Sequence, residues 1–419
     1  MNRNILSNSL VGFIILSLWG CTSGSQQQVK DNEDDYHVAA FYWPSMQDDQ
    51  RSREVFWGEG IGEWEMIRKG EPLFKGHYQP RVPLWGYELD NNPMVMEKKI
   101  AAAADHGVDI FIFDWFWFDG EPFLESTLND GFLKAGNRDR MEFFLFWGNH
   151  AATNNWNRHR YQNDTLIWEG EVDWENYRLI VDRVINRYFK QPNYFKIDGK
   201  PVFSLFDFSN LVKSFEGLEG TKEALDYFRA EVEQAGFPGL HLLVEITRYT
   251  KYMRDRTRRM EGNDLMDHIG IHSTAESEAN EIMEYLGINS ATVYTWALSN
   301  LDENYVRWAE GGVAYRDRWD SILDIPFMPN VSMGWDNSLR HPDFGREQVV
   351  HIGNSPESFG MYLQEAREFL DARPEQPPLI ILNAWNEWIE GSYLEPDMKW
   401  GYGYLEAVKK IMSGKYDNY

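Results

Sequence analysis

Residues 108–115 read VDIFIFDW, and this stretch decides the fold. Only Asp109 and Asp114 interrupt the apolar run, so it lacks the alternation of a strand with one wet face. A run of this kind is typical of a strand buried on both faces of a parallel sheet. Seven other runs have the same character, and they are residues 37–43, 141–147, 201–207, 240–246, 290–296, 327–332 and 379–383.

Longer amphipathic stretches lie between these runs and are expected to form helices. They include residues 93–106, 174–188, 221–235, 275–286 and 355–372. Eight strands that alternate with helices predict an α/β fold, namely a single TIM-type (β/α)8 barrel with elaborated βα loops. We place this domain at residues 36–419, because no internal repeat or second linker divides it.

The sixth strand has two candidates. Residues 268–272 (HIGIH) could replace residues 290–296 in this place. We favour residues 290–296, because a plausible helix directly precedes them.

The first 35 residues differ from the rest. Residues 1–20 contain Arg3, an apolar run and then Leu-Trp-Gly before Cys21, which resembles the signal peptide and lipobox of a bacterial lipoprotein. We expect lipidation of Cys21, the one cysteine in the chain, although an incidental cysteine after a secretory signal is the alternative. Residues 21–35 read as a flexible acidic tether. The expected location is the cell envelope, lipid-anchored through Cys21 at the outer membrane, on its periplasmic or surface face.

Composition excludes one class of partner. The 419 residues include 41 Lys and Arg against 66 Asp and Glu, a formal net charge of −25. Nucleic-acid binding needs a surplus of positive charge to displace counterions from phosphate, so no nucleic-acid partner is expected. Aromatic residues reach 15% and often stand beside polar ones, which suggests a flat, partly apolar ligand.

A barrel places its active site at the carboxyl ends of its strands. Acids, amides and aromatic rings recur together at nearly every predicted strand end. Sugars offer a C–H face to aromatic rings and hydroxyls to carboxylates and amides, so this combination favours an oligo- or polysaccharide substrate. The candidate substrate-binding residues are Tyr42, Glu63, Trp64, His77, Tyr78, Asp114, Trp117, Asn149, Tyr294, Trp335, Asp336, Arg340, Trp385 and Asn386.

Some of these residues have a second interpretation. His77 could be a structural residue that fixes a loop. Asp114 could pair with a buried cation instead of binding a hydroxyl. Asp336 is a good hydroxyl acceptor, and Arg340 is a candidate partner that orients it.

Glu387 and Glu390 lie three residues apart just after the last predicted strand, beside Trp385 and Trp388. The indole rings would exclude water and raise the pKa of a nearby carboxyl group. Glycoside hydrolysis commonly uses two carboxyl groups, one that protonates the leaving oxygen and one that acts as base or nucleophile. Most Glu pairs at this spacing lie on solvated helix faces, so the prediction of catalysis depends on the strand end and the aromatic neighbours.

At this point long motifs reveal a resemblance. Residues 382–396 (LNAWNEWIEGSYLEP) resemble the C-terminal motif of the WbsX-like proteins, a group related to glycoside hydrolase family 99. Residues 56–64 (FWGEGIGEW), 72–80 (PLFKGHYQP) and 334–340 (GWDNSLR) agree in order and spacing. The resemblance covers nearly all of the chain after the tether.

The resemblance implies a (β/α)8 barrel and retaining hydrolysis of α-mannosidic linkages, often within a glycan chain, without a metal or cofactor. Carried onto this chain, it makes Glu387 the base that acts on the sugar's own 2-hydroxyl, which then attacks C1. It makes Glu390 the acid for the departing oxygen and afterwards the base that activates water.

Two segments differ from the relatives and fall in the expected sugar subsites. Residues 113–118 read FDWFWF where WbsX-like proteins often have YYHYWF, and residues 147–150 read WGNH in place of a WANE-type sequence. A sugar other than mannose therefore stays open.

Two other functions stay open as well. Many WbsX-like proteins are labelled glycosyltransferases of polysaccharide assembly, but transfer from a nucleotide sugar needs a cytoplasmic donor and usually a metal or basic groups for the diphosphate. The expected export favours hydrolysis, and so does the lack of an Asp-x-Asp motif or a Gly-rich phosphate loop. A non-catalytic surface glycan-binding lipoprotein would leave Glu387 and Glu390 without a purpose. The ten His show no metal-binding spacing, so no metal site is expected.

Overall fold

The computed structural model describes residues 36–157, 165–261, 268–298, 302–340 and 350–414. The chain divides into two units, residues 1–35 and residues 36–419, and the second unit is described below. The predicted signal peptide (1–20), the lipidation site Cys21 and the tether (21–35) lie outside the described residues.

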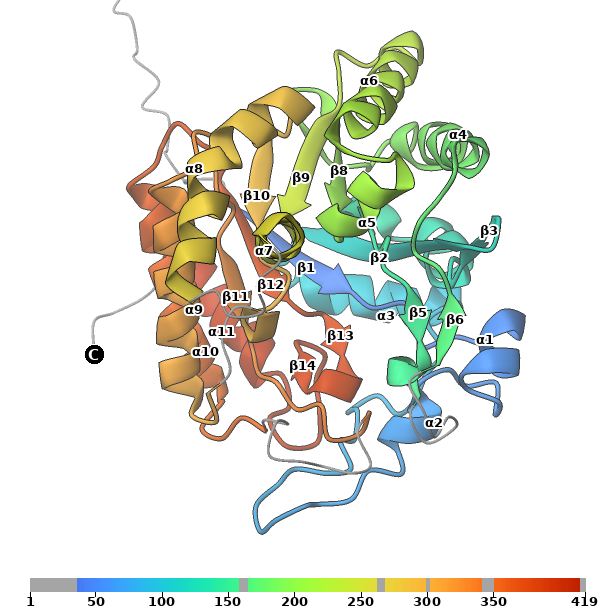
Figure 1. Ribbon diagram of the computed structural model, residues 1–419. Helices are drawn as coiled ribbons and strands as arrows, with labels where there is room; N and C mark the ends of the chain where they lie inside the picture. Colours follow the sequence, from blue (N-terminus) through green and yellow to red (C-terminus); the bar gives the residue numbers. More distant parts are fainter. Residues whose placement is uncertain (1–35, 158–164, 262–267, 299–301, 341–349, 415–419) are drawn as a thin grey trace, which may run out of the picture. The chain divides into compact units, whose positions relative to one another are not determined.

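Eight parallel strands form the barrel of this unit (Figure 1). They are β1 (His37–Tyr42), β2 (Ile110–Phe118), β4 (Glu142–Trp147), β8 (Lys200–Leu205), β9 (His241–Glu245), β10 (Ser290–Thr292), β11 (Asn330–Ser332) and β12 (Leu379–Asn383). Each of these strands pairs with the next one except β10 with β11, and β12 returns to β1 with His37 opposite Leu379. A parallel bridge between Ala291 and Phe327 joins β10 to the segment that leads into β11. The predicted (β/α)8 barrel is confirmed.

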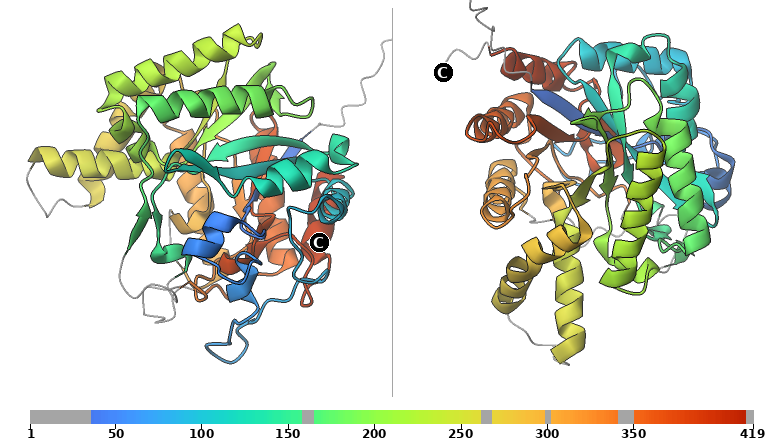
Figure 2. Two further views of the ribbon diagram at one scale, coloured as in Figure 1. Left: turned by 90° about the vertical axis from the view of Figure 1, so that its right-hand side faces the viewer. Right: turned by 90° about the horizontal axis from the view of Figure 1, so that it is seen from above.

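Helices surround the strands on the outside, as the views of Figure 2 show. The longer ones are α3 (Pro93–Ala104), α4 (Trp174–Arg183), α6 (Leu218–Gln234), α7 (Ile246–Glu261), α8 (His268–Leu286), α9 (Tyr305–Asp320), α10 (Pro356–Asp371) and α11 (Gly403–Met412). Four of these helices begin at a side chain that caps them. The capping residues of α3, α4, α9 and α10 accept hydrogen bonds from backbone nitrogens of the first turn, and they are Asn92, Asp173, Asn304 and Ser355.

The loops contain several short helices and strands. They are α1 (Gln50–Val55), α2 (Trp64–Ile67), α5 (Phe208–Ser214), the 3-10 helices η4 (Asn154–Trp156), η6 (Trp296–Leu298) and η7 (Trp388–Glu390), and the strands β3 (Glu121–Phe123), β5 (Ala152–Thr153), β6 (Leu166–Trp168), β7 (Lys196–Ile197), β13 (Asn386–Glu387) and β14 (Ser392–Tyr393).

The alternative for the sixth strand is resolved as favoured, one strand is longer than expected, and one connection contains no α-helix. Residues 268–272 belong to α8, so the sixth strand is β10, as favoured. Strand β2 runs on to Phe118, because its last residues form an antiparallel hairpin with β3. Residues 124–141 form no α-helix; a π-helix, η1 (Thr127–Gly131), and the 3-10 helices η2 (Phe132–Lys134) and η3 (Arg138–Arg140) connect β2 to β4 instead.

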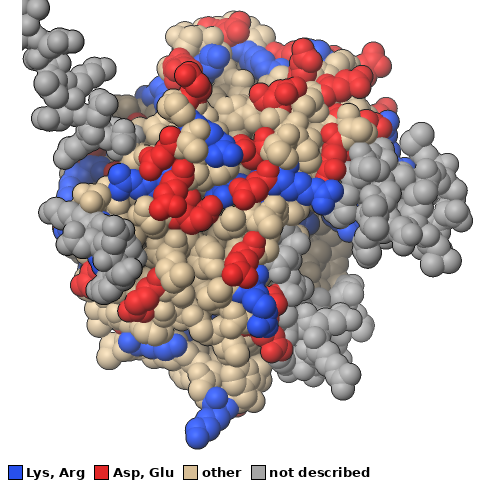
Figure 3. All heavy atoms as spheres, turned by 90° about the vertical axis from the view of Figure 1, so that its left-hand side faces the viewer, with Lys and Arg blue, Asp and Glu red and all other residues tan. Residues whose placement is uncertain are grey.

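The strands are apolar because both of their faces are covered. All nine residues of β2 are buried. On the face shown in Figure 3, acidic and basic side chains are interspersed over the helices. Within the described ranges, none of the helices has the length and apolar character needed to cross a membrane.

Candidate active site

A cavity of about 320 Å³ opens at the carboxyl ends of the strands. Its wall draws on segments that follow most strands of the barrel. The predicted residues that line it are Asp114, Tyr294, Trp335, Arg340, Glu387 and Glu390. The barrel thus brings together six predicted residues that lie up to 276 positions apart in the chain.

Glu387 and Glu390 sit on a tight turn after β12. Strands β13 and β14 pair with each other, with Glu387 opposite Ser392, and η7 spans the residues between them. Gly391 ends η7 with a φ of 71°, in the left-handed region that favours glycine. A Cβ atom at Gly391 would lie 2.5 Å from the Arg81 guanidinium, so glycine also permits this close approach. The turn therefore holds both carboxyl groups in fixed places.

Arg340 is the cation that faces the two carboxyl groups. Its Nη1 atom lies 2.9 Å from Glu390 Oε1, and its Nη2 atom lies 4.0 Å from Glu387 Oε2. Burial raises the pKa of both carboxyl groups, and the charge of Arg340 opposes this rise. The mutual repulsion with Glu390 raises the pKa of Glu387 further, to well above its usual range. Near neutral pH, the pair is therefore suited to hold a proton.

Tyr294 supplies the hydrogen bond to Glu387. Its hydroxyl lies 2.9 Å from Glu387 Oε1 and 3.3 Å from Asp114 Oδ2. The second oxygen, Glu387 Oε2, is buried without a hydrogen-bond partner, and so is Asp114 Oδ1. Burial raises the pKa of Asp114 well above its usual range. Two acceptor atoms in the cavity thus lack a partner that a sugar hydroxyl could provide.

Glu63 lies behind Arg340 and does not line the cavity. It accepts hydrogen bonds from Trp43 Nε1 at 2.6 Å and Ser45 Oγ at 2.9 Å, and Arg340 Nη2 lies 3.4 Å away. Burial raises the pKa of Glu63, and the charge of Arg340 opposes this rise. Glu63 therefore anchors Arg340 from behind.

Three predicted residues support the site from within the barrel and do not line the cavity. Tyr42 donates to Asp90 at 2.8 Å, and Trp385 Nε1 donates to Glu395 at 2.9 Å. Asn386 pairs with both backbone groups of Trp43, at 2.7 and 2.8 Å. These hydrogen bonds join β1 to the segment that carries Glu387.

Three further predicted residues also lie outside the cavity that contains Glu387 and Glu390. Trp64 is buried and donates to the backbone oxygen of Glu88 at 2.7 Å. Trp117 donates to Asn176 of α4 at 3.0 Å, because alternate residues of β2 point outward. Asn149 pairs with both backbone groups of Asp207, at 2.7 and 2.8 Å.

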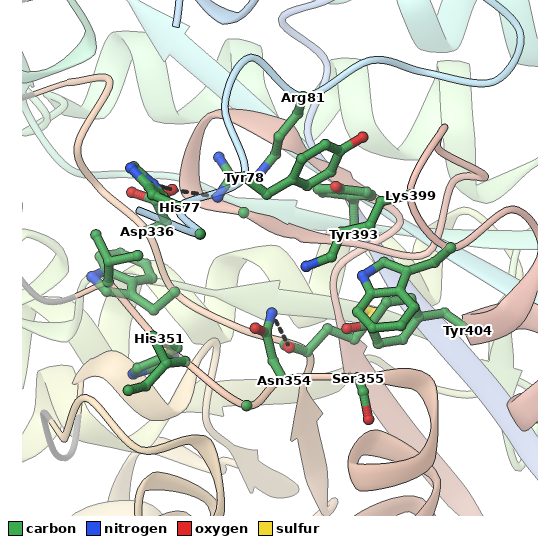
Figure 4. Close-up of a pocket in the computed structure, with 18 of the residues that line it drawn as sticks. His77, Tyr78, Arg81, Asp336, His351, Asn354, Ser355, Tyr393, Lys399 and Tyr404 are labelled. Atoms are coloured by element: carbon green, nitrogen blue, oxygen red, sulfur yellow. Dashed lines mark hydrogen bonds and ion pairs between the residues drawn. The ribbon is translucent and has the colours of Figure 1, made fainter. Parts of the chain in front are cut away.

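His77, Tyr78 and Asp336 line a second cavity of about 360 Å³. It shares Trp335 with the cavity that contains Glu387 and Glu390. In Figure 4, His77 and Asp336 lie on one side of this cavity, and Tyr393, Lys399 and Tyr404 lie on the opposite side.

The expected pairing of Asp336 with Arg340 is wrong. Asp336 forms an ion pair with Arg81 and also contacts His77 Nε2 at 2.8 Å and Gln79 Nε2 at 3.0 Å. Burial would raise the pKa of Asp336, but the charge of Arg81 and the hydrogen bond with His77 hold it well below the usual range. Arg340 is instead engaged by Glu63 and Glu390. Asp336 is therefore fully occupied within the protein and holds His77 in place.

Several lining residues were not among the candidate substrate-binding residues, although Phe116 and His150 lie in the two segments expected to form sugar subsites. Trp43, Phe116, Trp156 and Phe206 contribute aromatic faces, and His150 and Arg248 contribute polar groups. Burial lowers the pKa of His150 to about 4, so its ring is neutral near pH 7. Strand alternation could have identified Phe116, which follows Asp114 by two residues. Arg248 lies in α7, a helix that the sequence analysis did not single out.

No set of three or more His, Cys, Asp and Glu side chains within the described ranges is arranged to hold a metal ion. The expectation of a metal-free site stays a prediction.

The chain is similar to a known protein family and to curated relatives. The sequence profile of the family described as Glycosyltransferase WbsX matches residues 38–408. A curated relative, the uncharacterized protein WxcX of Xanthomonas campestris pv. campestris (strain B100), is 26% identical over 382 residues, which are 90% of this chain and 49% of the relative. The chain thus spans about half the length of the curated relatives it matches.

Solved structures share the fold. The GH99 endo-alpha-mannosidase from Bacteroides thetaiotaomicron aligns with a TM-score of 0.51 and 13% identity, over 90% of this chain and 97% of that one. A structure described as a glycoside hydrolase-like protein aligns with a TM-score of 0.54 and 15% identity, over 90% of this chain and 94% of the other. At these identities the similarity shows a common barrel.

Proposed function

The chain belongs to the family described as Glycosyltransferase WbsX, and we propose that it is a glycoside hydrolase that cleaves an α-linked glycan of the α-mannoside type with retention. The observation that carries the proposal is the cavity that holds Glu387, Glu390 and Arg340 together. Two buried carboxyl groups that line one cavity, one of them with an oxygen that lacks a hydrogen-bond partner among the described residues, are the groups that glycoside hydrolysis requires.

In the proposed reaction, Glu387 takes the proton of the sugar's 2-hydroxyl while that oxygen bonds to C1. The bond from C1 to the leaving oxygen breaks, and Glu390 gives its proton to that oxygen. Water then attacks C1, Glu390 takes a proton from the water, and Glu387 returns its proton to O2 as the C1–O2 bond breaks. Two inversions at C1 yield net retention.

The free site favours the opposite distribution of the proton. Arg340 lies closer to Glu390 than to Glu387, which favours the ionised form of Glu390. The proposed roles need the proton on Glu390, so a bound sugar has to weaken the contact between Arg340 and Glu390. The assignment of the two roles can therefore be tested separately from hydrolysis itself.

The first experiment measures product release by residues 22–419 from α-mannans and other α-linked polysaccharides. We expect release by the parent protein and a loss of at least a hundredfold in Glu390→Gln. Release of no product from any glycan would contradict hydrolysis, and retained glycan binding would then favour a binding protein.

The second experiment uses an α-glycosyl fluoride, whose leaving group needs no proton from an acid. We expect Glu390→Gln to retain fluoride release and Glu387→Gln to lose it. The reverse pattern would make Glu387 the acid.

We also propose that residues 1–20 direct export and that Cys21 carries a lipid. The support is the lipobox-like sequence before the one cysteine. Cys21→Ser should move the full chain from the membrane fraction to the soluble fraction, and an unchanged distribution would contradict the anchor.

Transfer from a nucleotide sugar is the second candidate function, and the description of the family favours it. Incubation of the protein with nucleotide sugars and acceptor glycans tests for this transfer.

A further inference from the structure

One cation in the catalytic cavity has no acidic partner. Arg248 lines this cavity, and its guanidinium carbon lies 4.4 Å from the centre of the Phe206 ring. Among the described residues, Arg248 forms no ion pair with a carboxylate, and its Nε atom is buried without a hydrogen-bond partner. The other arginine of the cavity, Arg340, is held by Glu63 and Glu390. Arg248 thus presents its charge to the cavity.

The carboxylate next to Arg248 is already engaged. Glu245 accepts hydrogen bonds from Thr247 Oγ1 at 2.7 Å and from the backbone nitrogens of Arg248 and Tyr294 at 3.0 and 3.3 Å. These donors reach both of its oxygens. The charge of Arg248 opposes the rise that burial gives to the pKa of Glu245, but among the described residues its guanidinium forms no ion pair with this carboxylate and remains available to a ligand.

The second cavity contains another cation without an acidic partner. The Lys399 ammonium lies 5.2 Å from the centre of the Tyr78 ring and 4.6 Å from that of Trp400. Lys399 forms no ion pair within the described ranges, whereas Arg81 in the same cavity is paired with Asp336. Partial burial lowers the pKa of Lys399, and the nearby charge of Asp397 opposes this fall.

The acid nearest to Lys399 is also occupied. Asp397 is buried and accepts from Tyr393 OH at 2.8 Å and from the backbone nitrogens of Lys399 and Trp400 at 3.1 and 2.6 Å. In a chain with 66 acids and 41 basic residues, cations without an acidic partner are unexpected in two neighbouring cavities. Each of them is placed to meet negative charge from a ligand.

The two cavities meet at Trp335, which lines both. We infer that the substrate is an anionic glycan chain that passes over Trp335 and places one carboxylate or sulfate substituent against Arg248 and another against Lys399. The inference depends on the proposed function only in assigning the glycan to the catalytic cavity. Guanidinium and ammonium groups bind both anions, and a planar guanidinium can bind a carboxylate through two parallel hydrogen bonds. The rings of Phe206, Tyr78 and Trp400 provide faces for the sugars beside these charges.

The test is a binding series on one backbone. The probes are α-mannan oligosaccharides, the same oligosaccharides oxidised at C6 to uronic acids, and the same oligosaccharides carrying sulfate esters. Binding to residues 22–419 with Glu390→Gln, which prevents turnover, is measured by calorimetry. We expect a charged form to bind at least tenfold more tightly than the neutral form, and the preferred charged form identifies the substituent.

Variants locate the charge recognition. Arg248→Gln and Lys399→Gln should each weaken binding of the preferred charged form by about tenfold to a hundredfold, the usual effect of losing a charged hydrogen bond. Binding of the neutral form should change less than threefold. Lys399→Arg should retain the preference, and Lys409→Gln, which removes a positive charge on α11 outside both cavities, should leave binding unchanged.

The outcomes separate this inference from the proposed function. Tighter or equal binding of the neutral form, or no binding of either charged form, overturns the inference even if neutral α-mannan is hydrolysed. Selective binding of a charged form by the parent protein without any turnover supports the inference and contradicts hydrolysis. A charge preference that survives in both Gln variants would show that neither residue recognises the anion.

Discussion

At the scale of single residues, Glu387 is a carboxyl group kept in an environment that disfavours its charge. Burial and the neighbouring Glu390 raise its pKa well above the usual range. The unfolded chain releases this proton at lower pH than the folded protein does. The folded state therefore loses stability as pH rises from about 4, the ordinary value for Glu, towards the folded pKa.

Glu387→Gln removes this pH-dependent loss. We expect the variant to gain stability relative to the parent between pH 4 and pH 8. The gain should be about 1.4 kcal/mol for each tenfold decrease that folding causes in the acid dissociation constant of Glu387. Denaturant unfolding of both proteins at the two pH values measures the difference. An equal difference at pH 4 and pH 8 would show that the pKa of Glu387 is ordinary.

The hydroxyl of Tyr294 donates a hydrogen bond to Glu387 Oε1. Its ring also packs against Phe146, 5.5 Å between centres, and Phe41, 4.6 Å, so Tyr294→Phe keeps the packing and removes the hydroxyl. Loss of a donor to an ionised group costs about 1.5–3 kcal/mol, so kcat/KM should fall about tenfold to a hundredfold. The acid limb of the pH profile should move to higher pH, because the ionised form of Glu387 loses its hydrogen bond.

Tyr177→Phe is the matched control for this change. Its hydroxyl donates to the backbone oxygen of Ala224 at 3.1 Å, outside both cavities. This variant should leave the pH profile unchanged. A similar shift in both variants would mean that the effect arises from general destabilisation.

The sequence predicts the role of a residue well only where that role does not depend on contacts with distant parts of the chain. Glu387 and Glu390 follow an apolar strand directly, and that position alone brings them to the cavity. Trp117 also stands at a strand end, but it points outward to Asn176. Asp336 and Arg340 lie four residues apart, yet they face different cavities, because Arg81, distant in sequence, pairs with Asp336. Such long-range charge pairing has no local signature.

At the scale of elements, two asparagines tie neighbouring strands of the barrel together. Asn386 pairs with both backbone groups of Trp43 beyond β1, and Asn149 does the same with Asp207 beyond β8. Backbone hydrogen bonds between two paired strands stop where the strands diverge. At that point, each asparagine amide provides hydrogen bonds to the neighbouring backbone instead. The loops that carry the active site begin at these points.

Asn149→Ala should therefore destabilise the barrel rather than a loop alone. The change leaves the buried N–H of Asp207 without a partner, whereas its C=O still accepts from the backbone nitrogen of Leu211 at 3.1 Å. We therefore expect a loss of about 1–3 kcal/mol in the free energy of unfolding, the cost of one buried donor without a partner. Urea denaturation measures it, and Asn186→Ala on the exposed face of the π-helix η5 (Val184–Phe189) is the control, expected to cost less than about 0.5 kcal/mol. Equal losses would refute the role of Asn149 in joining β4 to β8.

The sequence predicts elements well where one physical signal dominates. Strand β12 matches its apolar run at both ends, and α10 begins at Pro356, directly after the capping Ser355. The end of β2 was missed, because residues 116–118 are extended by pairing with β3, which depends on a hairpin partner. The segment 268–272 is apolar enough for a strand and becomes helical as part of α8. The pairing with β3 is not part of the pattern of β2 itself, and an apolar run as short as residues 268–272 is compatible with either a strand or a helix.

At the scale of the whole molecule, the net charge of −25 acts on stability through long-range repulsion. Two like charges 20 Å apart in water repel by only about 0.2 kcal/mol, but many such pairs are brought closer by folding. Surface ion pairs such as Arg307 with Asp302 oppose this effect, and each is worth only about 0–1 kcal/mol. Salt screens both interactions, and the sign of its effect on stability shows which one is larger.

We expect repulsion to be larger, so raising NaCl from 0.05 to 0.5 M at pH 7 should raise the Tm by a few degrees. At pH 4.5 many carboxylates are protonated, and the same salt step should have a smaller effect. Calorimetric melting at both pH values provides the measurement, with KCl as a control for effects specific to Na⁺. A Tm that falls with salt at pH 7 would mean that the ion pairs outweigh the excess negative charge, and that the acids are distributed so that folding brings few of them together.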